Sequence, residues 1–279
     1  MSNTIYSATG CTRCKIAKRC MSELGIAYEE QDMKAEGKEA FQKFYAANRK
    51  AIYRGADGVE FPIFSDGIVI RQGIGPVLAH LNYQEKLNGF FSVGSLHKEW
   101  VDGIHISGGN PEYAEEFLNV LRYLKTNNMK LQMDTDGRNP AILEKILLEK
   151  LADVVIMNIK GPGALYGQIV GEAVDAADIE KSMALVITAP AYRFRTSIVP
   201  VFREDGSISY LQPEEVAATA KWLDQVTGNK KLPYFIALAK PAELQDERLK
   251  LAEAMTADML FRYRTAARNH QVLVDIEKA

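Results

Sequence analysis

Cysteine is scarce in this chain of 279 residues, and the few cysteines are confined to one end. All three, Cys11, Cys14 and Cys20, lie within the first 20 residues, and the rest of the chain contains none. An odd and small number of cysteines argues against the structural disulfide framework of small secreted domains. Redox chemistry or metal binding is the better interpretation, and one short segment carries all of it.

Long apolar runs and a strong excess of charge are absent as well. No stretch approaches the roughly 18 uninterrupted apolar residues of a membrane-spanning helix, and the first residues do not read as a signal peptide. The formal net charge is -2, which argues against a general nucleic-acid-binding surface. Apolar residues make up 47% and charged residues 25%, which excludes a disordered chain. We expect a globular cytoplasmic protein of about two domains, without nucleic-acid or membrane binding.

The first 81 residues alternate between strand and helix patterns in the order βαβαββα. Asp66-Gly67, between two apolar runs, predicts a hairpin that joins the last two strands. The strands are predicted at residues 4–7, 26–33, 60–64 and 68–71. The helices are predicted at residues 11–24, 36–48 and 77–81.

Cys11 and Cys14 lie where the first strand meets the first helix. Unpaired backbone N–H groups and the helix dipole favour a thiolate at this position, and the positive charges of Arg13 and Lys15 act in the same direction. Cys11 is therefore the expected nucleophile and Cys14 the expected resolving thiol. Ligation of a metal by Cys11 and Cys14 and an inert pair of cysteines are the alternatives. Cys20 faces away from the pair on a helix of 3.6 residues per turn, so we expect it to be buried.

Residues 3–81 resemble glutaredoxin and the wider thioredoxin-like family. The residues that carry the resemblance are Cys11-Thr12-Arg13-Cys14 on the strand-to-helix turn, Phe61-Pro62 at the family's cis-proline, and Gly73 near its glycine turn. The resemblance implies thiol-disulfide exchange with a protein or low-molecular-weight thiol, glutathione among them. It also implies that Arg13, Phe61, Pro62 and Gly73 bind that thiol or peptide.

The remainder of the chain predicts a second domain of a different kind. Residues 83–100 show no clean period and are expected to connect domain 1–82 with domain 101–279. Five βα units in series predict an α/β fold with a parallel sheet or partial barrel, whose site lies at the carboxyl ends of the strands. The strands are predicted at residues 103–107, 130–134, 153–159, 192–200, 234–238 and 271–276. The helices are predicted at residues 111–126, 139–151, 178–187, 213–226, 241–254 and 257–267.

Four segments of this second domain resemble motifs of radical S-adenosylmethionine (SAM) enzymes, particularly the activating enzymes of glycyl-radical systems. The segments are ISGGNP at 106–111, DTDG at 134–137, DVVIMNIK at 153–160 and RTSIVP at 195–200. The resemblance covers about residues 100–240 and implies a partial (β/α) barrel of radical-SAM type. It also implies a candidate pocket for SAM or another nucleotide at Gly108, Gly109, Asn110, Asp134, Asp136, Asn158, Lys160 and Arg195.

The cluster ligands of that family are missing from this domain. Radical SAM chemistry needs three thiolates in a Cys-x3-Cys-x2-Cys motif to hold a [4Fe-4S] cluster. The spacing here is Cys-x2-Cys-x5-Cys, in the other domain. We therefore expect no iron-sulfur cluster and no firm cofactor, and interpret the second domain as a cluster-less scaffold that binds a ligand or presents the redox domain to a protein partner. The alternatives are a metal or iron-sulfur delivery protein, and a radical SAM protein whose cluster uses non-standard cysteines.

Two details of the candidate pocket have more than one interpretation. Arg193 and Arg195 share one face of a strand and suit a carboxylate or phosphate ligand, or else an internal salt bridge to Asp134 or Asp136. Gly108 and Gly109 suit a ligand site, or else a tight turn that requires a positive φ.

Overall fold

The structure is a computed structural model that describes residues 3–55, 58–203, 205–239, 244, 246–253 and 255–277. Two compact units divide the chain. Unit 1 comprises Met1–Met133 and Leu148–Asp153, and unit 2 comprises Asp134–Leu147 and Val154–Ala279. The expected connector, residues 83–100, lies within unit 1.

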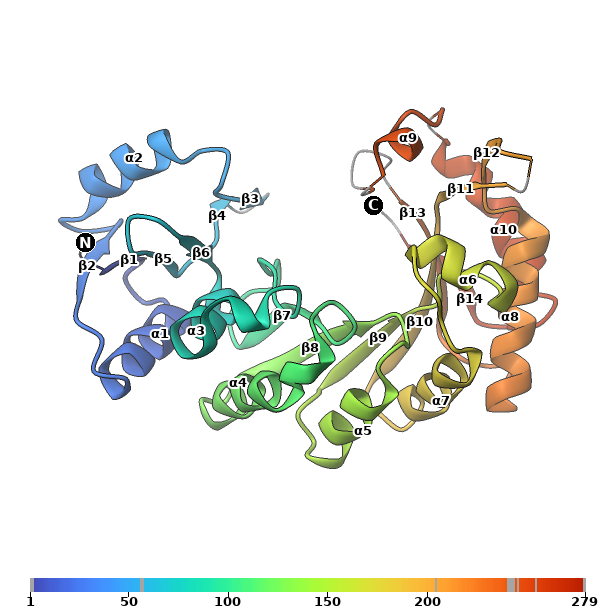
Figure 1. The fold of residues 1–279 in the computed structure, drawn as a ribbon, viewed down its shortest axis with the longest axis horizontal. Helices are drawn as coiled ribbons and strands as arrows, with labels where there is room; N and C mark the ends of the chain where they lie inside the picture. Colours follow the sequence, from blue (N-terminus) through green and yellow to red (C-terminus); the bar gives the residue numbers. More distant parts are fainter. Residues whose placement is uncertain are drawn as a thin grey trace. The chain divides into compact units, whose positions relative to one another are not determined.

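The N-terminal part of unit 1 has the predicted thioredoxin-like fold (Figure 1). Its four-stranded sheet has the order β2-β1-β5-β6, in which β2 is parallel to β1 and β5 is antiparallel to both β1 and β6. The strands are β1 (Asn3–Ser7), β2 (Tyr28–Asp32), β5 (Ile63–Ser65) and β6 (Ile70–Gln72). The helices are α1 (Thr12–Glu23), α2 (Lys38–Ala47) and α3 (Ile74–Tyr83).

Helices cover both faces of the sheet (Figure 1), and successive side chains of a strand point to opposite faces. Figure 1 shows α1 and α3 on one face and α2 on the other. Ile5 is fully buried, and its neighbour Tyr6 belongs to the cluster on the α2 side, where its ring lies 4.1 Å from that of Phe44. The insert before β5 forms a short hairpin that the sequence did not predict, β3 (Arg54–Gly55) with β4 (Gly58–Val59).

The junction between β5 and α3 depends on one proline and one glycine. The Phe61–Pro62 peptide bond is cis. The backbone N–H of Gly73 donates to the Pro62 carbonyl at 2.8 Å. Gly73 precedes α3 with a φ of 85°, a value that glycine adopts without steric cost. The residue type at 73 is therefore fixed by backbone conformation.

The segment that follows α3, from Gln84 to Met133, also belongs to unit 1. Leu87 and Phe90, in the expected connector, are buried at 2% and 0% exposure, and the Phe90 ring stacks on Phe117 with 4.3 Å between ring centroids. The elements are the 3-10 helix η1 (Gln84–Leu87), β7 (Trp100–His105), the 3-10 helix η2 (Pro111–Tyr113), α4 (Ala114–Thr126) and most of β8 (Lys130–Thr135). Residues of the connector are thus part of a hydrophobic core.

The second sheet is the predicted parallel sheet, with six strands in the order β14-β13-β10-β9-β8-β7. In unit 2, α7 packs against β9, α10 packs against β13 and β14, and α8 packs against both of these helices. The strands of unit 2 are β9 (Val154–Asn158), β10 (Tyr192–Ile198), β13 (Tyr234–Leu238) and β14 (Val274–Ile276), with a separate hairpin of β11 (Pro200–Phe202) and β12 (Ile208–Tyr210). The helices are α5 (Pro140–Leu148), α6 (Gly163–Val170), α7 (Ala176–Val186), α8 (Pro213–Thr227), α9 (Glu247–Lys250), the 3-10 helix η4 (Ala257–Met259) and α10 (Leu260–Ala267).

Three features of unit 2 differ from the sequence prediction. Helix α6 and the β11–β12 hairpin were not predicted, and both are short elements without a clear apolar period. Of the helix predicted at 241–254, the described part forms only α9, while residues 241–243, 245 and 254 lie outside the described residues. Among the helices of the described residues, none is both long and apolar enough to cross a membrane.

Candidate functional site

Cys11 and Cys14 are joined by a disulfide at the start of α1, with 5.3 Å between their Cα atoms. Cys11 is the N-cap residue of the helix, and its Sγ accepts a hydrogen bond from the backbone N–H of Cys14 at 3.1 Å. An unpaired N–H group at a helix N-terminus stabilises negative charge. When the disulfide is reduced, this geometry favours a thiolate on Cys11.

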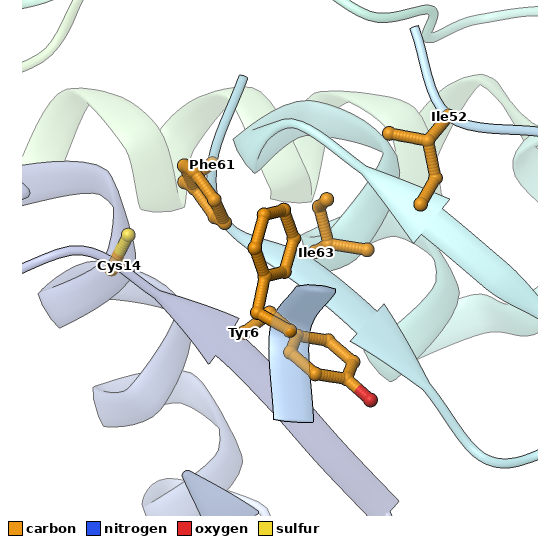
Figure 2. Packing of buried hydrophobic residues seen from close by; sticks show 6 residues of the cluster. Tyr6, Cys14, Ile52, Phe61 and Ile63 are labelled. Atoms are coloured by element: carbon orange, nitrogen blue, oxygen red, sulfur yellow. The ribbon is translucent and has the colours of Figure 1, made fainter. Parts of the chain in front are cut away.

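The two sulfurs differ in their access to solvent. Cys14 is 2% exposed and belongs to a hydrophobic cluster with Tyr6, Phe61 and Ile63, while Cys11 is half-buried at the edge of that cluster. Figure 2 shows Cys14 and Phe61 toward the same end of the cluster. Cys11 is therefore the more accessible of the two sulfurs.

A groove of about 1120 Å³ lies beside Cys11 within unit 1. On the side of the thioredoxin-like fold it is lined by residues of the CxxC turn and the β3–β4 region, among them Cys11, Arg13, Tyr53, Glu60 and Phe61. The remaining lining residues come from outside that fold. They are Gly94, Ser95, His97, Lys98 and Glu99 of the connector, with Asn127, Asn128 and Met129 of the turn between α4 and β8.

Arg13, between the two cysteines, is buried and fully engaged by the protein. Its guanidinium forms an ion pair with the Glu60 carboxylate and donates to the Leu96 carbonyl at 2.5 Å. Burial raises the pKa of Glu60, although the positive charges of Arg13 and His97 act in the opposite direction. His97 lies 3.9 Å from the second carboxylate oxygen. Arg13 thus links the CxxC turn to Glu60 and to the connector residue Leu96.

The connector loop is fixed at its other end by Asp102. One carboxylate oxygen of Asp102 accepts the backbone N–H groups of Ser95 and Leu96 at 2.9 and 3.0 Å, and the other accepts the Ser95 hydroxyl at 3.0 Å. A Cβ on Gly94 would collide with the same carboxylate, so a larger residue there would displace the Asp102 side chain from these hydrogen bonds. Asp102 and Arg13 together hold the loop against the groove.

The other predicted binding residues of this domain fall into two groups. Arg13 and Phe61 line the groove together with Cys11. Pro62 and Gly73 are buried behind it and hydrogen-bonded to each other. Sequence reasoning did not identify Glu60, Leu96 or His97. The sequence holds one signal that could have pointed to such a partner: residues 12–20 contain four basic residues and no acidic one, so a carboxylate that pairs with Arg13 has to come from elsewhere in the chain.

Cys20 is buried at 2% exposure, as the sequence predicted. Burial raises the pKa of its thiol, and Asn82 donates a hydrogen bond to its sulfur at 3.4 Å. Two of the three thiols of this chain are thus paired with each other and the third is enclosed in a core. This donor set does not fit a [4Fe-4S] cluster, which needs three thiolates facing one point. In the part of the chain that the structure describes, no group of three potential metal ligands converges.

In unit 2, two predicted pocket residues line one cavity. Asp136 and Lys160 line a space of about 700 Å³ together with Arg138, Ser197 and Arg248. Arg138 forms an ion pair with Asp136 at 2.7 Å. Burial lowers the pKa of Lys160, against the opposing effect of nearby carboxylates.

Asn158 is the last residue of β9 and lies two positions before Lys160, but it does not line this cavity. Its side-chain amide donates to the Ser197 hydroxyl at 3.3 Å. Its Oδ1 atom is buried without a hydrogen-bond partner among the described residues. An acceptor in this state is rare in proteins and is usually satisfied by water or a ligand.

Arg193 and Arg195 share a face of β10, as predicted, and a carboxylate lies between them. It is the side chain of Glu277, with one oxygen 3.4 Å from Arg193 and the other 3.4 Å from Arg195. The sequence left open a carboxylate or phosphate ligand and a salt bridge to Asp134 or Asp136, and the carboxylate that the structure places beside the two arginines is that of Glu277.

Gly108, Gly109 and Asn110 belong to unit 1, whereas the other predicted pocket residues belong to unit 2. Neither glycine has a positive φ, so the expectation that the turn requires a positive φ at these positions is wrong. A Cβ on Gly108 would collide with the backbone of Gly89, and a Cβ on Gly109 would collide with the ring of Phe90. The Asn110 side chain accepts the Glu112 N–H at 3.0 Å and caps η2. Close packing on the connector therefore explains the two glycines.

No protein-family model matches the chain. Over 157 residues the chain is 26% identical to a putative glycyl-radical enzyme activating enzyme of Methanocaldococcus jannaschii. The match covers 54% of this chain and 60% of that protein, so the chain spans less than two thirds of the relative's length.

Two solved structures are similar to separate parts of the chain. NrdH-redoxin, a glutaredoxin-like protein of Escherichia coli with a thioredoxin-like activity profile, is 25% identical over 27% of this chain and 87% of its own, with a TM-score of 0.21. A domain of the pyruvate-formate lyase-activating enzyme of Bacteroides vulgatus is 14% identical over 64% of this chain and 100% of its own, with a TM-score of 0.44. The chain combines the thioredoxin-like fold of its N-terminal strands and helices with a region that is similar in sequence to a putative glycyl-radical enzyme activating enzyme, as the two sets of motifs predicted.

Proposed function

We propose that this protein is a thiol-disulfide oxidoreductase whose nucleophile is Cys11 and whose resolving thiol is Cys14. The observation that carries the proposal is the placement of the Cys11 sulfur at the N-terminus of α1, bonded to Cys14 and within 3.1 Å of the Cys14 N–H. The printed description of NrdH-redoxin as thioredoxin-like in activity agrees with this function.

The reaction proceeds in two exchange steps that start from the reduced protein. The Cys11 thiolate attacks one sulfur of a substrate disulfide, which breaks the substrate S–S bond and releases one substrate thiolate. Cys14 then loses its proton and attacks the Cys11 sulfur, which releases the second substrate thiol and forms the Cys11–Cys14 disulfide. The substrate gains two electrons and two protons, and the protein loses them. A thiol reductant restores the dithiol for the next cycle.

A single-turnover experiment tests this function. The protein is reduced with dithiothreitol, freed of it anaerobically and mixed with bis(2-hydroxyethyl) disulfide. We expect two equivalents of 2-mercaptoethanol per protein and a Cys11–Cys14 disulfide in peptide mass spectra. Cys14→Ser should stop at a mixed disulfide on Cys11, and Cys20→Ser, the matched control, should behave like the wild type. Equal reactivity of Cys11→Ser and the wild type would rule out the proposed nucleophile.

We propose that the second half of the chain acts as a cluster-less scaffold that binds a ligand or a protein partner. The absence of any cysteine after Cys20 supports this role, because the residues similar to an activating enzyme supply no thiolate. Anaerobically purified protein should contain neither iron nor acid-labile sulfide. A brown protein that loses its colour in Cys11→Ser would contradict both proposals and favour a metal-binding function.

A further inference from the structure

The cavity of about 700 Å³ in unit 2 has the size and the position of a small-molecule site. Its volume falls within the roughly 300–1,000 Å³ of such sites. It lies beyond the carboxyl ends of β9 and β10, where α/β folds with parallel strands bind their ligands. The apolar part of its described lining consists of Ile169, Val170, Val199, Val201, Phe202 and Leu249.

Ion pairs engage both guanidinium groups in the lining of this cavity. Arg138 is paired with Asp136 at 2.7 Å and also with Glu172. Arg248 is paired with Asp246 at 2.6 Å. A charged ligand that used one of these groups would have to break an ion pair, so a neutral ligand fits the cavity better.

Lys160 lines the same cavity with an unpaired amine. Its side chain forms no hydrogen bond and no ion pair with any residue that the structure describes. Burial lowers the pKa of this amine, and the positive charges of Arg195 and Arg138 act in the same direction. The carboxylates of Asp136 and Asp134 oppose them. A lysine amine that is shielded from water and close to other cationic groups is a nucleophile for carbonyl carbon atoms.

A hydroxyl group lines the cavity at the position that corresponds to Lys160 on the neighbouring strand. Ser197 on β10 and Lys160 after β9 each lie two residues beyond the register pair of Arg195 and Asn158. The Asn158 amide donates to the Ser197 Oγ at 3.3 Å, whereas the Ser197 proton has no acceptor in the described part of the chain. The Ser197 hydroxyl can therefore donate to an oxygen atom of a ligand in the cavity.

We propose that Lys160 binds a neutral aldehyde or ketone in this cavity as an imine, and that Ser197 donates a hydrogen bond to the carbonyl oxygen. The neutral amine attacks the carbonyl carbon, and the proton that the nitrogen loses passes to the oxygen, which gives a carbinolamine. The C–O bond then breaks, water leaves and the C=N bond forms. Nothing is oxidised or reduced, and hydrolysis reverses the reaction. The inference rests on the ligand-binding role proposed for the second half of the chain and not on thiol-disulfide exchange.

Reductive trapping tests the imine. The oxidised full chain is mixed at neutral pH with benzaldehyde, a neutral probe, and with sodium cyanoborohydride, which reduces an imine to a stable benzylamine. Peptide mass spectrometry should find Lys160 benzylated roughly tenfold faster than Lys221, an exposed lysine of unit 2, because more of its amine is neutral. Equal rates at the two lysines would overturn the inference.

Two comparisons examine the hydroxyl and the charge of the ligand, each through the ratio of the rate at Lys160 to the rate at Lys221. Ser197→Ala should lower this ratio several-fold because the carbonyl oxygen loses its donor, whereas Ser22→Ala, in unit 1, should leave it unchanged. An unchanged ratio in Ser197→Ala would overturn the role of Ser197. The ratio should also be lower for 4-carboxybenzaldehyde and for 4-(trimethylammonio)benzaldehyde than for benzaldehyde, and a higher ratio for either would overturn the neutral ligand class.

A protection experiment separates this inference from the proposed functions. Benzyl alcohol has the shape of benzaldehyde but forms no imine, and its binding in the cavity should protect Lys160 from acetylation by limiting acetic anhydride. Protection by benzyl alcohol without trapping of benzaldehyde would overturn the imine and keep the ligand-binding scaffold. Trapping at Lys160 in a protein that does not reduce bis(2-hydroxyethyl) disulfide would remove the oxidoreductase and support the imine.

Discussion

The guanidinium of Arg13 is ion-paired with the carboxylate of Glu60, and the two side chains are only 9% and 14% exposed. Arg13 lies between the reactive cysteines, and Glu60 precedes the cis Phe61–Pro62 bond. The pair therefore joins the two segments that form the redox site. Because each charge is largely removed from water, the loss of one partner leaves the other without compensation.

Arg13→Met should lower the free energy of unfolding of unit 1 by about 2–4 kcal/mol, since it leaves the Glu60 carboxylate buried without its partner. Glu60→Gln should restore part of this loss when it is combined with Arg13→Met. Urea denaturation in a Trp222→Phe background checks this, because Trp100 is then the sole tryptophan and reports on unit 1. Additive effects of the two substitutions would show that the pair does not couple.

The pH dependence of stability should reveal the carboxyl of Glu60. Burial raises its folded pKa above the unfolded value of 4.5, so the folded protein binds this proton more tightly. The stabilising contribution is complete below about pH 4.5 and is lost as the pH rises through the raised folded pKa. The free energy of unfolding of the wild type should fall over this interval relative to that of Glu60→Gln. A slope of the same size in Glu60→Gln would show that the carboxyl of Glu60 is not its source.

The three thiols of the reduced protein should react with iodoacetamide in a fixed order. Cys11, half-buried at a helix N-terminus, should be alkylated first and Cys14 more slowly. Cys20 should stay unmodified at neutral pH until the protein unfolds, because burial raises the pKa of its thiol. Peptide mass spectrometry over time measures the order. Early labelling of Cys20 in the folded protein would contradict its burial.

Gly109→Ala should destabilise unit 1 by about 1–3 kcal/mol, because the new Cβ collides with the Phe90 ring. Phe90→Leu should cancel part of this cost when the two substitutions are combined, although it is destabilising by itself. Thermal unfolding followed by Trp100 fluorescence gives the comparison. Two substitutions that add independently would mean that Gly109 is needed for another reason, such as the approach of a ligand.

Lys160 should be acetylated at a lower pH than exposed lysines of unit 2. It lines a cavity, and burial lowers its pKa, so a larger fraction of its amine is neutral near pH 7. Mass spectrometry of peptides treated with limiting acetic anhydride between pH 6 and 9 gives the rate profile. The exposed Lys221 is the control, and identical profiles for the two lysines would contradict the prediction.

Patterns among residues close together in the sequence predicted much of the fold and the two cysteines at the centre of the candidate site. Apolar periodicity placed most strands and long helices, and the position of Cys11 and Cys14 at a strand-to-helix turn marked the reactive pair. The burial of Cys20 followed from helix geometry alone. Each of these inferences uses residues close together in the chain, where pattern and geometry are directly linked.

The sequence did not predict which charged and polar residues pair when they lie far apart in the chain. Arg13 meets Glu60 47 residues away and Leu96 83 residues away, and Arg195 meets Glu277 82 residues away. No spacing rule links such positions, because tertiary packing decides which charges meet. Gly108 and Gly109 show the same limit, since their motif suggested a turn or a ligand, whereas the backbone of Gly89 and the ring of Phe90 account for them.

The burial of Leu87 and Phe90 limits where the N-terminal fold could be exchanged for that of another protein. A redoxin cut out at residue 82 would leave behind two side chains that fill a core next to Phe117. The surface of α1 is also committed, since Arg19 and Glu23 hydrogen-bond to Asn127 and Tyr123. Recombination that exchanged the N-terminal fold for another redoxin would have to carry these contact residues with it. We therefore expect the thioredoxin-like fold and α4 to be exchanged together, because they share these contacts.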